Sequence, residues 1–165
     1  GGVLLDSNGL VVGITTAVVS GSQGVGFAIP SDTIIRELSS LVSTGGYNGH
    51  SYLGISGVDM DYQLAQSSKT NVTYGILIEV VAPGGPAEKA GIRVGSTNVV
   101  VDGQEYVVGG DIIVSANGTK LINNDALASY LALNTSPGQT VAFGLIRGGQ
   151  QTTVDVTLGT RPALS

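Results

Sequence analysis

Residues 110–118 read Gly-Asp-Ile-Ile-Val-Ser-Ala-Asn-Gly, and the interpretation of the chain starts from this stretch. Its run of β-branched residues predicts a strand. The Asn-Gly pair predicts a tight turn at the strand's end, because both residues tolerate positive φ angles. Upstream, residues 76–81 have the composition of a second strand. Between the two, Pro86 opens and Gly91 closes a single helical turn, in keeping with the preference of proline and glycine for the two ends of helices.

The sequence on either side of residues 76–118 predicts further strands and a helix. Residues 52–58, Tyr-Leu-Gly-Ile-Ser-Gly-Val, place a glycine directly before a strand. Downstream, Asn123-Asn124-Asp125 can cap a helix in which Leu127 and Leu131 are spaced i, i+4. The sequence then predicts two last strands, residues 141–146 and 152–158, which are joined by a turn at residues 147–150. This order predicts a mainly β fold with two or three short helices (α+β), arranged as a small, partly open β-barrel.

The amino-terminal part predicts a hairpin, a third strand and a helix. Residues 3–5 and 10–19 are β-rich, and the Asn8-Gly9 pair between them favours a hairpin turn. Residues 24–29 predict a short strand that Pro30 stops. Ser31 or Asp32 can then cap a helix that ends by Gly45-Gly46. Its apolar face is expected to hold Ile34, Ile35, Leu38, Leu41 and Val42.

The stretch 44–49 has the composition of a flexible linker. We therefore divide the chain into residues 1–45 and a body of residues 46–165.

The body resembles a PDZ domain of the kind found in HtrA/Deg-type serine proteases. Three motifs carry the resemblance: Tyr52-Leu53-Gly54-Ile55, Pro86-Ala87-Glu88-Lys89-Ala90-Gly91-Ile92, and Gly110-Asp111-Ile112-Ile113 followed by Asn117-Gly118. They are similar to the family's carboxylate-binding loop, its short helical turn, and its "G-D-I-I" strand and turn. The chain departs from the family pattern at about residues 96–110, where we expect an inserted hairpin at the surface.

Residues 1–45 look like the last strands and helix of a trypsin-like β-barrel in the same family. The resemblance rests on the stretches 1–6, 9–14 and 24–30. In that family Gly-Gly follows the nucleophilic serine, so the resemblance implies that this chain starts after that serine and lacks the catalytic triad. It further implies that the parent protein is a serine endopeptidase. Ile14, Thr15, Thr16 and Ala17 would border the substrate pocket of that parent.

The resemblance also implies a peptide-binding site in the body. Successive N–H groups around a glycine can hold a terminal carboxylate, and the edge of the next strand can accept a peptide as one more strand. The expected site residues are Tyr52, Leu53, Gly54, Ile55, Ser56, Gly57, Val58, Asn124, Leu127, Ala128 and Leu131. The leucines have an alternative role as core residues only. His50 either attracts the ligand's carboxylate in a pH-dependent way or is a solvated linker residue.

Composition excludes several other classes. A net charge of −5 argues against nucleic-acid binding. The absence of cysteine excludes disulfides and thiolate chemistry, and a single histidine makes a zinc site improbable, so no cofactor and no metal are expected. Only 12% of the residues are charged, which favours an extracytoplasmic setting, secreted, periplasmic or at the cell surface.

Three functions remain open at this point. The favoured one is a peptide-binding module, within a protein-quality-control protease, that recognises the C-termini of peptides or unfolded proteins. A second is a nicked but active protease that retains its amino-terminal half. A third is a structural or assembly module. In addition, the strands within residues 3–29 have edges that could pair with a second copy or exchange strands with it.

Overall fold

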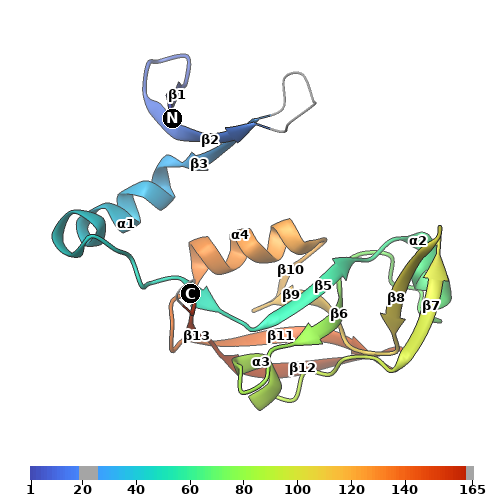
Figure 1. The fold of residues 1–165 in the computed structure, drawn as a ribbon. Helices are drawn as coiled ribbons and strands as arrows, with labels where there is room; N and C mark the ends of the chain where they lie inside the picture. Colours follow the sequence, from blue (N-terminus) through green and yellow to red (C-terminus); the bar gives the residue numbers. More distant parts are fainter. Residues whose placement is uncertain (19–25, 163–165) are drawn as a thin grey trace. The chain divides into compact units, whose positions relative to one another are not determined.

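A computed structural model describes residues 1–18 and 26–162. The chain forms two compact units, Gly1–Gly49 and His50–Ser165, and each is described by itself (Figure 1). It is mainly β with short helices, as predicted.

The first unit is a three-stranded antiparallel sheet followed by a helix. The strands β1 (Val3–Leu5), β2 (Val11–Val18) and β3 (Gly26–Pro30) lie in chain order. The predicted hairpin is confirmed, and its turn is held by the Asp6 carboxylate, which accepts the N–H groups of Asn8 and Leu10. Gly9 supplies the positive φ angle, 80°. The predicted strand residues 19, 24 and 25 lie outside the described residues.

Helix α1 (Ser31–Thr44) begins one or two residues earlier than predicted. Its N-cap is Pro30, with no side-chain hydrogen bond, so the prediction that Ser31 or Asp32 caps the helix is wrong. Proline fits this place because its fixed φ leads from β3 directly into the helix. The predicted end is confirmed: Gly45 adopts a left-handed conformation and donates its N–H to the Leu41 carbonyl. The helix buries no side chain.

The second unit is built on an antiparallel sheet with the order β12-β11-β9-β6-β5, in which β10 also pairs with β9. The strand bounds are β5 Ile55–Asp59, β6 Ile76–Val81, β9 Ile112–Ala116, β10 Thr119–Lys120, β11 Thr140–Arg147 and β12 Gln150–Thr157. Strand β5 is thus an edge strand. Two short strands, β4 (Ser51–Tyr52) and β13 (Gly159–Thr160), pair next to it. Three helices complete the unit: α2 Tyr62–Ser67, α3 Pro86–Lys89 and α4 Asn124–Asn134.

Both faces of this sheet are covered. Along β6, Ile76 and Ile78 belong to one buried cluster, which includes Phe143 and Leu127, while the intervening Leu77 belongs to another. This alternation follows from the two-residue period of a strand. Helix α4 contributes to the first cluster, and α2 contributes to the second.

The inserted hairpin consists of β7 (Thr97–Val101) and β8 (Gln104–Val108). The hairpin lies at the surface, as predicted, with nine of its ten residues exposed or half-buried, but one of its faces also packs inward. Val108 is buried, and Val99, Val101 and Tyr106 pack against the second cluster. The insertion therefore helps to complete a core. Helix α2, on which the hairpin packs, was not predicted; its signal is Asp61, whose carboxylate caps the helix at the Leu64 N–H.

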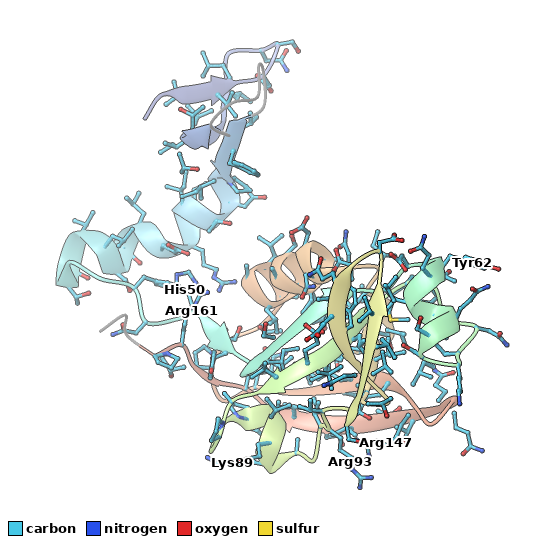
Figure 2. The ribbon with its side chains drawn as sticks, turned by 45° about the vertical axis from the view of Figure 1, so that its right-hand side comes forward. His50, Tyr62, Lys89, Arg93, Arg147 and Arg161 are labelled. Carbon is cyan, nitrogen blue, oxygen red and sulfur yellow. The ribbon has the colours of Figure 1, made fainter. Side chains whose placement is uncertain are left out.

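An ion pair between a buried aspartate and a partly exposed arginine joins the predicted motifs. The Asp111 side chain is fully buried and accepts bonds from Nε and Nη2 of Arg147, both at 2.7 Å. It also accepts the N–H of Arg93 at 2.8 Å, and Arg147 Nη2 donates to the Gly91 carbonyl. Figure 2 shows Arg93 and Arg147 at the same side of the unit. The hydrogen bond to Asp111 raises the pKa of Arg147 further above its already high ordinary value. The aspartate of the "G-D-I-I" motif thus joins α3's end to β9 and β11.

Candidate functional site

A groove of about 390 Å³ lies between the start of β5 and helix α4. This volume is in the range of ligand-binding clefts. The lining residues are His50, Ser51, Tyr52, Leu53, Gly54, Ile55, Asn124, Asp125, Leu127, Ala128, Leu131, Ala132 and Arg161. Apolar side chains and polar groups are thus combined along an edge strand.

The loop at one end of the groove turns its backbone amides toward the cavity. The Leu53 carbonyl accepts the Ala87 N–H, and the Gly54 carbonyl accepts the Ala82 N–H. In a planar trans peptide the C=O of one residue and the N–H of the next point in opposite directions. The N–H groups of Gly54 and Ile55 therefore point away from α3 and β6, toward the groove. This arrangement is suited to holding an anion.

Glycine is required at the centre of this loop. Gly54 has a φ of 80°, which side chains other than glycine rarely adopt. A Cβ atom there would also lie 3.3 Å from the Tyr52 ring and 3.5 Å from the Pro86 ring. The Leu-Gly-Ile sequence thus determines the loop conformation locally.

Two basic residues stand at the loop end of the groove. His50 and Arg161 both line it, and the Arg161 N–H donates to the His50 carbonyl at 3.0 Å. Figure 2 shows the two side by side. The acidic residue of the lining is Asp125, in the first turn of α4. The groove is therefore basic where the backbone amides converge and acidic at the start of the helix.

Helix α4 forms the facing wall. Asn123 is its N-cap and accepts the Ala126 N–H at 2.9 Å, as the sequence predicts. Leu127 is 5% exposed and belongs to the first core cluster, and Leu131 packs against that cluster while half-buried. Both also line the groove, so their place in the core does not exclude contact with a ligand.

The C-terminal end of α4 is tied to the loop side by hydroxyl groups. Thr135, 3% exposed, donates to the Leu131 carbonyl at 2.6 Å. Ser51 Oγ bonds to the same carbonyl at 3.2 Å and also contacts the Thr135 hydroxyl. These bonds hold the two walls together near the basic residues.

Most of the predicted site residues gather in this groove, but three do not line it: Ser56, Gly57 and Val58. Ser51, Asp125, Ala132 and Arg161 were not predicted. Arg161 arrives through the pairing of β13 with β4, between residues more than a hundred positions apart, which no local pattern reveals. The spacing of Ala132 from Ala128 on one helix face was an available signal.

The residues predicted to border a protease pocket lie in the first unit, on β2. Thr15 Oγ1 accepts the Gly2 N–H at 2.8 Å, and Thr16 Oγ1 donates to the Phe27 carbonyl at 3.3 Å. The backbone of Ile14 pairs with β1 and β3. Their role in a substrate pocket stays a prediction.

Across residues 1–18 and 26–162, no three acidic or histidine side chains come together in a way that could hold a metal ion. In the same residues, none of the helices combines the length and the apolar character that crossing a membrane requires.

Comparison with known proteins identifies the family to which this chain belongs. The family model "PDZ domain" matches residues 51–158. The periplasmic pH-dependent serine endoprotease DegQ of Escherichia coli is 36% identical over 168 residues, covering 100% of this chain and 33% of DegQ. The chloroplastic protease Do-like 1 of Arabidopsis thaliana is 37% identical over 165 residues, covering 98% and 35%. The chain thus spans about a third of the length of these relatives.

Solved structures of HtrA proteins also align with this chain. An HtrA-type protease AlgW with a decapeptide aligns with a TM-score of 0.69 and 27% identity, covering 98% of this chain and 46% of the other. The HtrA3 PDZ domain bound to a phage-derived ligand aligns at 0.50 with 23% identity over 67% of this chain and 86% of the other, which supports the fold. The chain belongs to the PDZ domain family, in the form that HtrA/Deg serine proteases contain.

Proposed function

We propose that the groove binds the free C-terminus of an extended peptide. One observation carries the proposal: Gly54 and Ile55, whose amides point away from β6, line the same groove as His50 and Arg161, next to an edge strand. A terminal carboxylate would accept the amides, and the peptide would add antiparallel to β5. The apolar lining, Leu53, Leu127 and Leu131 among others, favours a hydrophobic last residue.

The test is a calorimetric titration of the chain with hydrophobic C-terminal peptides. Each peptide is paired with its C-terminal amide, which has the same side chains but no carboxylate. We expect the free acids to bind at least about tenfold more tightly, since the amide loses charge-assisted bonds. Equal binding of acid and amide would contradict carboxylate recognition. Absence of binding to any peptide would contradict the proposed function as a whole.

We further infer that residues 1–45 are part of a trypsin-like protease domain. The alignment with DegQ extends through the whole chain, and the described strands of this segment leave large apolar side chains exposed, among them Val3 at 59%, Leu5 at 56% and Phe27 at 58%. Such side chains are normally covered by further strands. The parent protein would then be a serine endopeptidase of protein quality control outside the cytoplasm, whose PDZ domain presents or senses exposed C-termini.

On this proposal the chain by itself binds peptides without cleaving them. A fluorophosphonate probe on purified material distinguishes the alternative of a nicked protease: labelling of an associated fragment supports that alternative, and no labelling supports the binding module.

The exposed apolar strands also favour self-association through residues 3–29, of which 19–25 lie outside the described part. Sedimentation of the chain tests this: a dimer or larger species is expected, and a monomer at high concentration contradicts it.

A further inference from the structure

The start of helix α4 is joined to the edge strand β5 by three hydrogen bonds that Asn124 donates to Asp59 and Gly57. The Asn124 backbone N–H donates to Asp59 Oδ1 at 2.7 Å. Its side-chain Nδ2 donates to the same oxygen at 2.8 Å and to the Gly57 carbonyl at 3.1 Å. Asn124 thus uses its amide to bridge the two walls at the end of the groove away from the basic residues.

The Gly57 carbonyl lies on the edge that an added strand would use. At the two ends of β5, the Gly54 carbonyl and the Met60 N–H both bond toward β6. Backbone groups alternate between the two edges of a strand, so Ile55, Gly57 and Asp59 direct theirs to the opposite edge. The bulge in this ladder lies between Ser56 and Gly57, whose partners Val80 and Ile78 leave the extra residue on β6. The alternation along β5 is therefore uninterrupted.

The position of Gly57 relative to the loop sets a limit on the ligand. When a terminal carboxylate occupies the Gly54 and Ile55 amides, the last ligand residue lies beside Ile55. In an antiparallel pair the next backbone group of β5 that faces the ligand belongs to Gly57, and it meets the third residue from the ligand's end. The N–H of that ligand residue would donate to the Gly57 carbonyl, which already accepts the Asn124 side-chain amide.

We propose that Asn124 is a latch that restricts strand addition to the last two residues of the ligand. The Asn124 amide takes the place that the ligand's third N–H would otherwise fill. A longer ligand has to exchange one hydrogen bond for another, so its added residues contribute little affinity. The latch rests on the proposed function, because it concerns the same groove and the same ligand orientation.

Neighbouring contacts favour the latched arrangement. Asp59 Oδ1 accepts two bonds from Asn124, one of them from the helix's first turn, where a carboxylate is favourable. Strands β5 and β6 approach each other closely at Gly57, since a Cβ atom at this position would lie 2.3 Å from the Leu77 carbonyl oxygen. Gly57 therefore has little room to move toward β6 and away from Asn124. The latch therefore joins two elements that are each held in place.

The experiment measures affinity against ligand length on the full chain. The probes are peptides of two, three, four and six residues that end in valine with a free carboxylate and carry alanine before it. The readout is the ratio of the six-residue to the two-residue affinity. In the unmodified chain we expect a ratio close to one. In Asn124→Ala, which opens the Gly57 carbonyl, we expect the ratio to rise by about three- to tenfold, the effect of one net hydrogen bond.

Asn134→Ala is the matched control. It changes the same residue type at the other end of the same helix, where Asn134 Nδ2 donates to the Tyr130 carbonyl, and it should leave the ratio as in the unmodified chain. A ratio in Asn124→Ala equal to that of the control overturns the latch. If no peptide binds either protein, the proposed function fails and the latch fails with it.

A second measurement needs no variant. In a nitrogen-15 NMR titration of the unmodified chain, the side-chain NH2 signal of Asn124 should shift with the six-residue peptide and stay in place with the dipeptide. If the signal responds alike to both peptides, or to neither while both bind, the latch is refuted.

Discussion

Removing the Asp111 carboxylate is expected to destabilise the second unit strongly. In Asp111→Ala the part-buried hydrogen bond from the Arg93 N–H is lost, and a hydrogen bond to a charged group typically contributes about 1.5–3 kcal/mol. Two charge-assisted bonds to Arg147 are lost as well, each typically contributing about 1.5–3 kcal/mol. The Arg147 side chain is 30% exposed, so water replaces part of that loss. We therefore expect a net decrease of about 3 kcal/mol in the free energy of unfolding.

Urea unfolding followed by far-UV circular dichroism measures this decrease, since the chain has no tryptophan to serve as a fluorescent probe. With an m-value of about 2 kcal/mol per molar urea, the midpoint should fall by about 1.5 M without a change in m. The control is Asp155→Ala, an exposed aspartate on β12. Its midpoint should stay within about 0.3 M of the unmodified chain.

A double-mutant cycle with Arg147→Met isolates the pair. The double variant should be about 1.5–3 kcal/mol more stable than the sum of the single effects, because neither charge is then left without the other. Arg147 stays charged in each protein that retains it, because an arginine side chain is not deprotonated in proteins. A midpoint for Asp111→Ala equal to that of the control, or a coupling below about 0.5 kcal/mol, would refute the structural role assigned to this motif residue.

Two further predictions concern charge. In the unmodified chain, the affinity for a peptide with a free terminal carboxylate should increase by about two- to fivefold between a pH above neutrality and a pH below it. In His50→Ala this increase should be absent. An equal increase in both proteins would exclude an electrostatic role for His50. The Leu10 amide, which bonds to the Asp6 carboxylate, is the main cause of that carboxyl's lowered pKa, with Asn8 adding to it. The turn should therefore be intact above pH 3.8 and loosen only as the pH falls through the lower folded value, so an NMR titration of the Leu10 amide with a midpoint at or above 3.8 would contradict this assignment.

Much of the fold could be predicted because its signals are local. Asn117-Gly118, Gly45 and the Asn123 cap each act within a few residues of themselves, and the structure places each where the sequence indicates. The loop at Gly54 is similar, since this glycine determines its own backbone conformation. Helix α2 was missed because it has only six residues, too few for a clear apolar period.

The site could be predicted only in part. The loop and the helix wall carry motifs, whereas Arg161 reaches the groove through a strand pair that joins distant parts of the chain. The bond between Asn124 and Gly57 could not be predicted either, because these residues lie 67 positions apart in the sequence. A residue's capacity to donate a bond is visible in the sequence, but its acceptor is not.

The sequence alone indicated the family, the succession of strands along the chain and the conformation of the loop at Gly54, because each depends on backbone preferences of neighbouring residues. Tertiary structure alone decided that the inserted hairpin completes a second core, that Asp111 is buried against Arg147, and that Asn124 occupies the β5 edge. These features depend on which distant surfaces meet, and burial and hydrogen-bond partners exist only once they have met.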